Sequence, residues 1–203
     1  MGDCSVYLLL DTGVLDGRDA LEVARLSLEG GVGVVQLRAK GWAAREQVAL
    51  AQALLPLTGA YNVPLIINDH TDVALAVGAA GVHLGVDDLP VALARQIMPM
   101  GVIGYSPEGV ADAQRAAAEG ADYLGVGPFA STRTKQDAGA PIGAAGLAAI
   151  AGAVRLPVLA IGGLTVSMIP EAVAAGIVVG AALLTASDPT TAFPGLQQYQ
   201  QHT

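Results

Sequence analysis

Three polar side chains, Gln36, Arg38 and Lys40, alternate with Leu37 and Ala39 at the end of a short apolar run. In an extended strand this alternation places the three polar side chains on one side. A guanidinium binds two phosphate oxygens through its planar fork, and an ammonium adds a compact positive charge. The motif therefore predicts an anion-binding strand end. A solvated strand end is the alternative.

Carboxylates follow two further apolar runs, at Asn68-Asp69 and at Asp87-Asp88. Asp69 could cap a helix that begins near Thr71, and one of the other two could cap a helix that begins at Pro90. Three carboxylates exceed what capping needs. Oxygen ligands of this kind suit Mg²⁺, which often bridges protein carboxylates to substrate phosphates. We therefore expect Mg²⁺ beside the bound anion.

A serine and a histidine also lie at or near strand ends. Ser106 follows Gly104-Tyr105 and is expected to present a hydroxyl at the site, or else to cap a helix that opens at Pro107. His83 lies on a buried strand, where a hydrogen-bonded core histidine is favoured over a catalytic one.

The segment that contains Thr132, Thr134 and Lys135 concentrates hydroxyl and ammonium donors, which suits a phosphate. Gly163, in Gly162-Gly163, lets backbone N–H groups approach an anion, and Gly180 is expected to complete the cup, as in barrels with a phosphate site at the last strands. These donors suffice for two phosphate-bearing groups, a pyrophosphate and a monophosphate. A metal beside a bound pyrophosphate indicates a reaction in which the pyrophosphate leaves a carbon atom. Positive charge then develops on that carbon.

Short apolar runs alternate with alanine-rich helical patterns along the whole chain. The expected strands are Val6–Leu10, Val34–Leu37, Pro64–Ile67, Gly81–Leu84, Val102–Gly104, Asp122–Val126, Pro157–Ile161 and Ile177–Val179. The expected helices are Ala20–Gly30, Ala43–Leu57, Thr71–Val77, Pro90–Met98, Pro107–Glu119, Gly143–Val154, Val166–Ala175 and Pro189–Gln201. Eight such units predict an α/β protein, either a closed (β/α)₈ barrel or an open doubly wound sheet.

The closed barrel is favoured because no G-x-G-x-x-G pattern follows the first strand, and because unusual residues follow many strands. The prediction is a single-domain (β/α)₈ TIM barrel with a closed parallel sheet over residues 1–203. A net charge of −8 and a pI of about 4.6 argue against nucleic acid and anionic membranes as partners. Cys4 is the only cysteine, and neither a signal peptide nor a membrane span is evident, so a cytoplasmic protein is expected.

Six ordered motifs along the chain resemble those of the thiamine phosphate synthase family. They are Val35-Gln36-Leu37-Arg38-Ala39-Lys40, Ile67-Asn68-Asp69, Gly81-Val82-His83-Leu84-Gly85 with Asp88-Leu89-Pro90, Gly125-Val126-Gly127-Pro128, Thr132-Arg133-Thr134-Lys135 and Ala160-Ile161-Gly162-Gly163. The resemblance implies a (β/α)₈ barrel that joins an aminopyrimidine methyl pyrophosphate to a thiazole phosphate and releases pyrophosphate.

By this resemblance, Asp69 and Asp88 would bind Mg²⁺, and a dissociative, carbocation-like substitution is implied. The pyrimidine pyrophosphate would be held by Gln36, Arg38, Lys40, Asn68, Ser106 and Lys135. The thiazole phosphate would be held by Thr132, Thr134 and Gly163, with Gly180 nearby. Arg38, Lys40, Ser106 and Lys135 are the expected catalytic residues.

The chain departs from the family pattern at Val86, in the residues after Ser106 and in a shortened segment before Gly180. The rival enzyme is a thiazole tautomerase on the same barrel. Lys135 and Pro128 favour the synthase over this isomerase. A sugar-phosphate isomerase or aldolase would not explain the paired carboxylates. A non-catalytic barrel that binds thiamine phosphates stays an alternative, and so does a homodimer.

Overall fold

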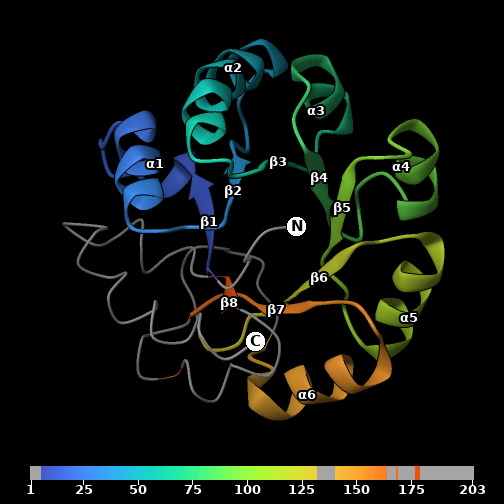
Figure 1. Ribbon diagram of the computed structural model, residues 1–203. Coiled ribbons are helices and arrows are strands. Elements are labelled where there is room, and N and C mark those ends of the chain that lie inside the picture. Colours follow the sequence, from blue (N-terminus) through green and yellow to red (C-terminus); the bar gives the residue numbers. More distant parts are fainter. Residues whose placement is uncertain (1–5, 132–139, 164–167, 169–176, 179–203) are drawn as a thin grey trace.

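The computed structural model of this chain describes residues 6–131, 140–163, 168 and 177–178. Its strands form a parallel sheet that curls around a central axis (Figure 1). The strands are β1 (Val6–Asp11), β2 (Val34–Arg38), β3 (Leu65–Asn68), β4 (Gly81–Leu84), β5 (Val102–Tyr105), β6 (Tyr123–Val126), β7 (Val158–Ala160) and β8 (Ile177–Val178). They pair in chain order, and the two-residue β8 pairs with both β7 and β1. The predicted α/β class and TIM-barrel-like sheet are confirmed.

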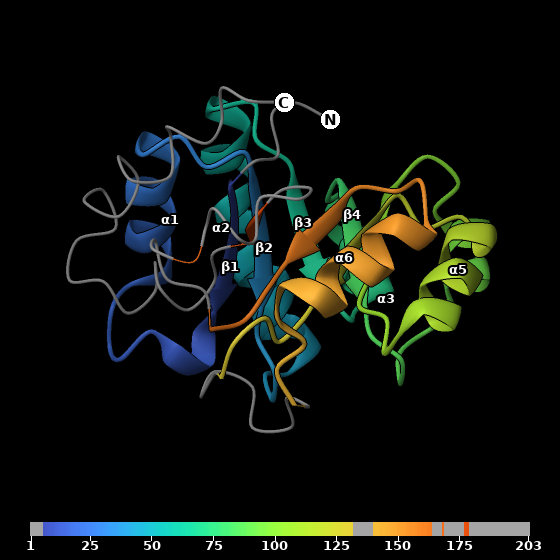
Figure 2. The same cartoon turned by 90° about the horizontal axis from the view of Figure 1, so that it is seen from below.

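The described helices lie outside the sheet, each between two consecutive strands of the chain (Figures 1 and 2). They are the short 3₁₀ helix η1 (Thr12–Val14), α1 (Ala20–Glu29), α2 (Ala44–Ala60), α3 (Thr71–Val77), α4 (Val91–Ile97), α5 (Val110–Glu119) and α6 (Gly143–Ala153). The helices expected at Val166–Ala175 and Pro189–Gln201 lie outside the described residues. Among the described helices, none combines the length and the apolar character that a membrane crossing requires.

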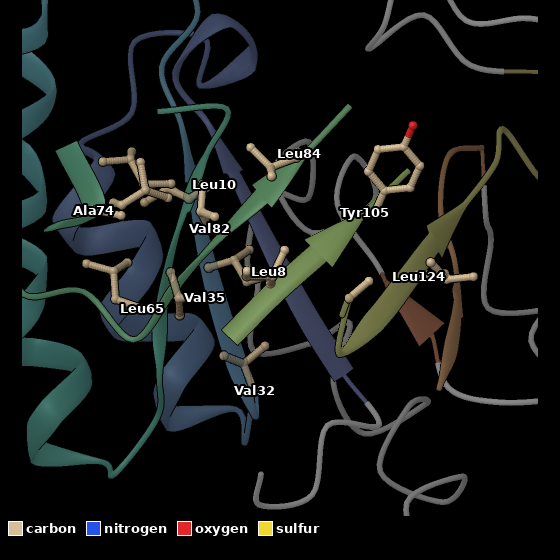
Figure 3. Close-up of a cluster of buried hydrophobic side chains, with 14 of the residues drawn as sticks. Leu8, Leu10, Val32, Val35, Leu65, Ala74, Val82, Leu84, Tyr105 and Leu124 are labelled. Atoms are coloured by element: carbon tan, nitrogen blue, oxygen red, sulfur yellow. The ribbon is translucent and has the colours of Figure 1, made fainter. Parts of the chain in front are cut away.

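Apolar side chains pack on both faces of the sheet, as expected for parallel strands under a layer of helices. The larger cluster, which includes Leu8, Leu10, Val35 and Val82, lies between the strands and the helices (Figure 3). The smaller cluster consists of Tyr7, Val34, Ile66, Tyr123 and Leu159.

Strand alternation explains how the inner face becomes polar toward the strand ends. Val34 belongs to the inner cluster, so Gln36 and Arg38, two and four residues later, point to the same side. On β1 the same rule aligns Asp11 with Tyr7. The inside of the curled sheet therefore holds this smaller cluster, with its two tyrosines, and becomes charged at the carboxyl ends of the strands, which is where TIM-barrel enzymes build their sites.

Candidate active site

Arg38 and Asp11 form an ion pair across the ends of two neighbouring strands. They are register partners in the β1–β2 ladder, and the Arg38 guanidinium donates a hydrogen bond to the Asp11 carboxylate. Their side chains are only 16% and 3% exposed. The other Asp11 oxygen accepts the N–H of Gly13 at 2.9 Å, where η1 begins. A guanidinium carries five N–H donors, so Arg38 can bind an anion while Asp11 holds its orientation.

Lys40 and Asp69 bring a cation and a carboxylate together at the next strand end. The Lys40 ammonium lies 3.5 Å from Oδ2 of Asp69, and the lysine side chain is half-exposed. Asp69 has a φ of 63°, in the left-handed region that few residues other than glycine adopt. Its N–H donates to the carbonyl of His83 at 2.8 Å, which ties this conformation to β4. The N-cap of α3 is His70, so Asp69 does not cap that helix.

Asp88 lies close enough to Asp69 to change its titration. Burial raises the pKa of the Asp69 carboxyl, contact with Asp88 raises it further, and Lys40 lowers it in part. Asp88 itself accepts the N–H of Gly85 at 2.6 Å. The N-cap of α4 is Pro90, which has no side-chain cap, so Asp88 is not used for capping either.

The Asp69–Asp88 pair fits Mg²⁺ by its chemistry. Two hard oxygen donors with mutual repulsion gain from a divalent cation between them, and Mg²⁺ sites usually need one or two carboxylates plus substrate phosphates and water. Within the described residues, no group of three or more His, Cys, Asp or Glu side chains could hold a metal ion. The two carboxylates would therefore hold Mg²⁺ together with oxygens of a bound phosphate.

Ser106 and Gln36 lie at the two ends of a buried chain of hydrogen bonds. Gln36 Nε2 donates to the Tyr7 hydroxyl at 2.9 Å, and the hydroxyls of Tyr7 and Tyr123 are 2.8 Å apart. The Tyr123 hydroxyl lies 2.9 Å from His83 Nδ1, and His83 Nε2 lies 2.8 Å from Ser106 Oγ. His83 is 7% exposed, so the predicted hydrogen-bonded core histidine is confirmed. Ser106 bonds to His83 and α5 begins only at Val110, so the capping alternative is wrong.

Gly163 brings the loops after β6 and β7 into close contact. It has a φ of 70°, and a Cβ atom there would lie 2.5 Å from the carbonyl oxygen of Ala130 and 2.7 Å from that of Ser131. Only glycine fits both the left-handed backbone and the space. This contact joins Gly163 to the start of the segment that contains Thr132, Thr134 and Lys135. Those three residues and Gly180 lie outside the described residues.

The described site residues lie at the carboxyl ends of neighbouring strands. Asn68 closes β3 next to Asp69 and is nearly buried. Sequence reasoning missed Asp11, although it directly follows an apolar strand in the same way as Asp69. It also missed Tyr7 and Tyr123, whose positions within strands indicate only a core role. Cations and paired carboxylates at one edge can bind a polyanion and a divalent metal together.

Comparison with known proteins identifies a consistent set of relatives. Residues 6–186 match the family described as thiamine monophosphate synthase. The chain is similar to a thiamine-phosphate synthase of Herpetosiphon aurantiacus, with 59% identity over 94% of this chain and 93% of the relative. It is similar to another from Chloroflexus aurantiacus, with 45% identity over 94% and 89%.

Solved structures agree with the sequence relatives. The thiamine phosphate pyrophosphorylase from Pyrococcus furiosus superposes with a TM-score of 0.89 and 34% identity, over 98% of this chain and 96% of that one. The 3-hexulose-6-phosphate synthase from Salmonella typhimurium has a TM-score of 0.73 and 16% identity, over 98% and 100%. The second likeness concerns the fold alone.

Proposed function

We infer that this chain, which belongs to the thiamine monophosphate synthase family, is a thiamine-phosphate synthase. The observation that carries the inference is the meeting of Lys40, Asp69 and Asp88 at one edge of the sheet, in a chain with such relatives. The proposed reaction joins 4-amino-2-methyl-5-(diphosphomethyl)pyrimidine to a thiazole phosphate and releases pyrophosphate. Both substrates are small molecules, and the acidic charge of the chain argues against nucleic acid as a partner.

The pyrophosphate end of the pyrimidine is proposed to bind Arg38, Lys40 and Lys135. Arg38 is held by Asp11 and Lys40 lies beside Asp69, so both cations are oriented before the substrate arrives. Such preorganised charges stabilise a leaving group without reorganisation during the reaction. Ser106 would add a hydroxyl contact to the pyrophosphate, and Gln36 and Asn68 would hold the remainder of the substrate.

Asp69 and Asp88 are the proposed ligands of Mg²⁺. When bound, Mg²⁺ would neutralise charge on the departing pyrophosphate. The contact with Asp88, which adds to burial in raising the pKa of Asp69, supports this assignment, because two neighbouring carboxylates favour a cation between them. Positive charge then develops on the methylene carbon as the C–O bond to pyrophosphate breaks, and the thiazole nitrogen captures that carbon.

The thiazole phosphate is proposed to bind Gly163 together with Thr132, Thr134 and Gly180. The close contact of Gly163 with Ala130 and Ser131 supports this pocket, because it joins two of the contributing loops. Fixing both substrates in separate phosphate pockets would set the attack geometry, and this kind of positioning can remove a large part of a barrier.

A complete eight-unit barrel formed by residues 1–203 as one domain is part of the proposal. The pairing of β8 with both β7 and β1 supports it. The cytoplasm is the proposed compartment, in agreement with a single cysteine.

One assay tests the activity. Purified protein is incubated with both substrates and Mg²⁺, and formation of thiamine phosphate is followed. Product that depends on both substrates and on Mg²⁺ is expected. Binding of both substrates without product would refute the synthase and support a binding protein. Isomerisation of a thiazole substrate without coupling would support the tautomerase.

A further inference from the structure

A buried hydrogen-bonded chain crosses the inside of the curled sheet and joins two proposed substrate contacts. This network, called the relay below, runs from Gln36 on β2 through Tyr7 on β1, Tyr123 on β6 and His83 on β4 to Ser106 after β5. Its four contacts are all between 2.8 and 2.9 Å. The three inner residues are between 1% and 7% exposed. Buried polar groups connected in this way restrict each other's orientation.

The backbone around this chain leaves room for it. A Cβ atom on Gly104 would lie 2.3 Å from the Tyr123 hydroxyl and 2.4 Å from His83 Nδ1. A Cβ atom on Gly125 would lie 2.9 Å from His83 Cε1 and 3.6 Å from Ser106 Oγ. Glycines on β5 and β6 thus stand beside the two contacts that His83 makes. The sheet accommodates this chain of hydrogen bonds at positions where any larger residue would displace it.

The direction of donation that we propose begins at the first member of the chain. Gln36 donates an amide N–H to Tyr7. If Tyr7 then donates to Tyr123, and Tyr123 to His83 Nδ1, each hydroxyl gives one hydrogen bond and accepts one, and the bonds strengthen each other. Nδ1 of His83 is then an acceptor, so the neutral ring carries its proton on Nε2. That proton is donated to Ser106 Oγ, and the Ser106 hydroxyl keeps its own proton for another acceptor.

We propose that Tyr7, Tyr123 and His83 are positioning residues that make Ser106 a hydrogen-bond donor to the substrate, an inference that rests on the proposed function. The acceptor is an oxygen of the bound pyrophosphate, which gains negative charge as it departs. The opposite sense would direct the Ser106 proton to His83 Nε2 and present only lone pairs to the anion. The sense of the relay therefore decides whether Ser106 attracts or repels the leaving group.

The tautomer of His83 tests the sense without any assay of activity. The chain has three histidines, so two-bond ¹H–¹⁵N correlation spectra at mildly alkaline pH are readily assigned with His70→Gln and His202→Gln variants. A neutral His83 ring with its proton on Nε2 is expected. A proton on Nδ1 would overturn the proposal, whether or not the protein is a synthase.

A substitution at the far end of the relay provides a second spectroscopic test. Gln36→Glu replaces the donor by a carboxylate that can only accept from Tyr7, which reverses every later bond. The His83 proton should move from Nε2 to Nδ1 in this variant. An unchanged tautomer would contradict the proposal that donation from Gln36 sets the direction of the later hydrogen bonds.

Kinetics test whether the relay acts through Ser106. Tyr123→Phe keeps the ring but removes the hydroxyl, and should lower kcat by about tenfold, as expected for loss of one oriented hydrogen bond. Combined with Ser106→Ala, it should lower kcat no further than Ser106→Ala alone. If the two substitutions lowered kcat by independent factors that multiply in the double variant, a role of Tyr123 through Ser106 would be refuted.

Tyr105→Phe is the matched control, because Tyr105 is also a buried strand tyrosine, but its hydroxyl bonds to Asp112 and Arg115 outside the relay. It should retain normal kcat. If Tyr123→Phe does not fold, Tyr7→Phe tests the same relay one step earlier, with a smaller expected loss. A normal kcat in a folded Tyr123→Phe or Tyr7→Phe variant would overturn the proposal.

Discussion

Replacing Asp11 by asparagine removes the charge that holds Arg38 at the end of β2 and changes little else. Asparagine keeps the shape of the side chain and an oxygen that can accept the N–H of Gly13. The guanidinium of Arg38, only 16% exposed, is then left beside a neutral amide. The substitution therefore isolates the charge of the pair from its packing.

The size of the effect follows from the burial of the pair. A hydrogen bond to a charged group contributes about 1.5–3 kcal/mol to stability, and Asp11→Asn loses the one to Arg38, because the asparagine oxygen that accepts from Gly13 leaves its NH2 group facing the guanidinium. We expect Asp11→Asn to lower the free energy of unfolding by about 2 kcal/mol. In a chain of this length that corresponds to a fall in Tm of roughly 4–8 °C. The KM for the pyrimidine pyrophosphate should rise as well, because Arg38 loses its fixed orientation.

Thermal unfolding and steady-state kinetics of three variants test this reasoning. Glu22→Gln is the matched control, because Glu22 pairs with Arg25 in a similar way but on the exposed face of α1. Exposed pairs contribute little, so its Tm should stay near that of the unmodified chain. Arg38→Met leaves the Asp11 carboxylate buried without its partner and should cost at least as much as Asp11→Asn. A Tm for Asp11→Asn that matches Glu22→Gln would refute the argument.

Further predictions concern the metal, the leaving group and the loop contact. Lys135→Ala should lower kcat by roughly 10²–10³-fold through loss of a counter-charge, and near-normal turnover would contradict its role. Asp88→Asn should raise the Mg²⁺ concentration needed for half-maximal activity by about tenfold or more, and an unchanged titration would count against it as a ligand. Because burial and Asp88 raise the pKa of Asp69, stability without Mg²⁺ should fall as pH rises from the ordinary aspartate range through that raised pKa. Tm measured against pH in chelator should show this fall, and Asp69→Asn should remove it. Gly163→Ala should lower Tm and raise the KM for the thiazole phosphate, whereas Gly152→Ala, in open space on α6, should do neither.

The strands were predictable because buried parallel strands are continuous apolar runs. Each described strand lies within two residues of its expected bounds, since turn residues interrupt those runs sharply. Helix ends were less predictable. The sequence pattern predicts that this helix ends at Leu57, yet α2 continues to Ala60 with Pro56 inside it, although a proline cannot donate a helical hydrogen bond. Thr58, in that last turn, is buried and bonds to the carbonyl of Leu55, so packing outweighs the proline.

Site residues were predictable where polar side chains come at, or within a few residues of, the end of an apolar run. Arg38, Lys40, Asp69 and Asp88 have this pattern, and the structure adds their partners. Capping was a real alternative for Asp69 and Asp88, and local sequence alone does not decide against it. The decision comes from the start of each helix, at Thr71 and Val91, with His70 and Pro90 at the N-caps.

The relay residues were hidden for a different reason. Tyr7 and Tyr123 lie within apolar strands, where an aromatic side chain indicates a core position, and that interpretation is correct for their rings. Their hydroxyls meet across 116 residues of chain, only because the curled sheet brings β1 and β6 to face each other from inside. A buried hydroxyl requires a partner, so two tyrosines and a histidine on the inner faces of different strands imply a shared network. The sequence does not show which partners these groups find, because only the curvature of the sheet brings them together and determines that the network ends at Gln36 and Ser106.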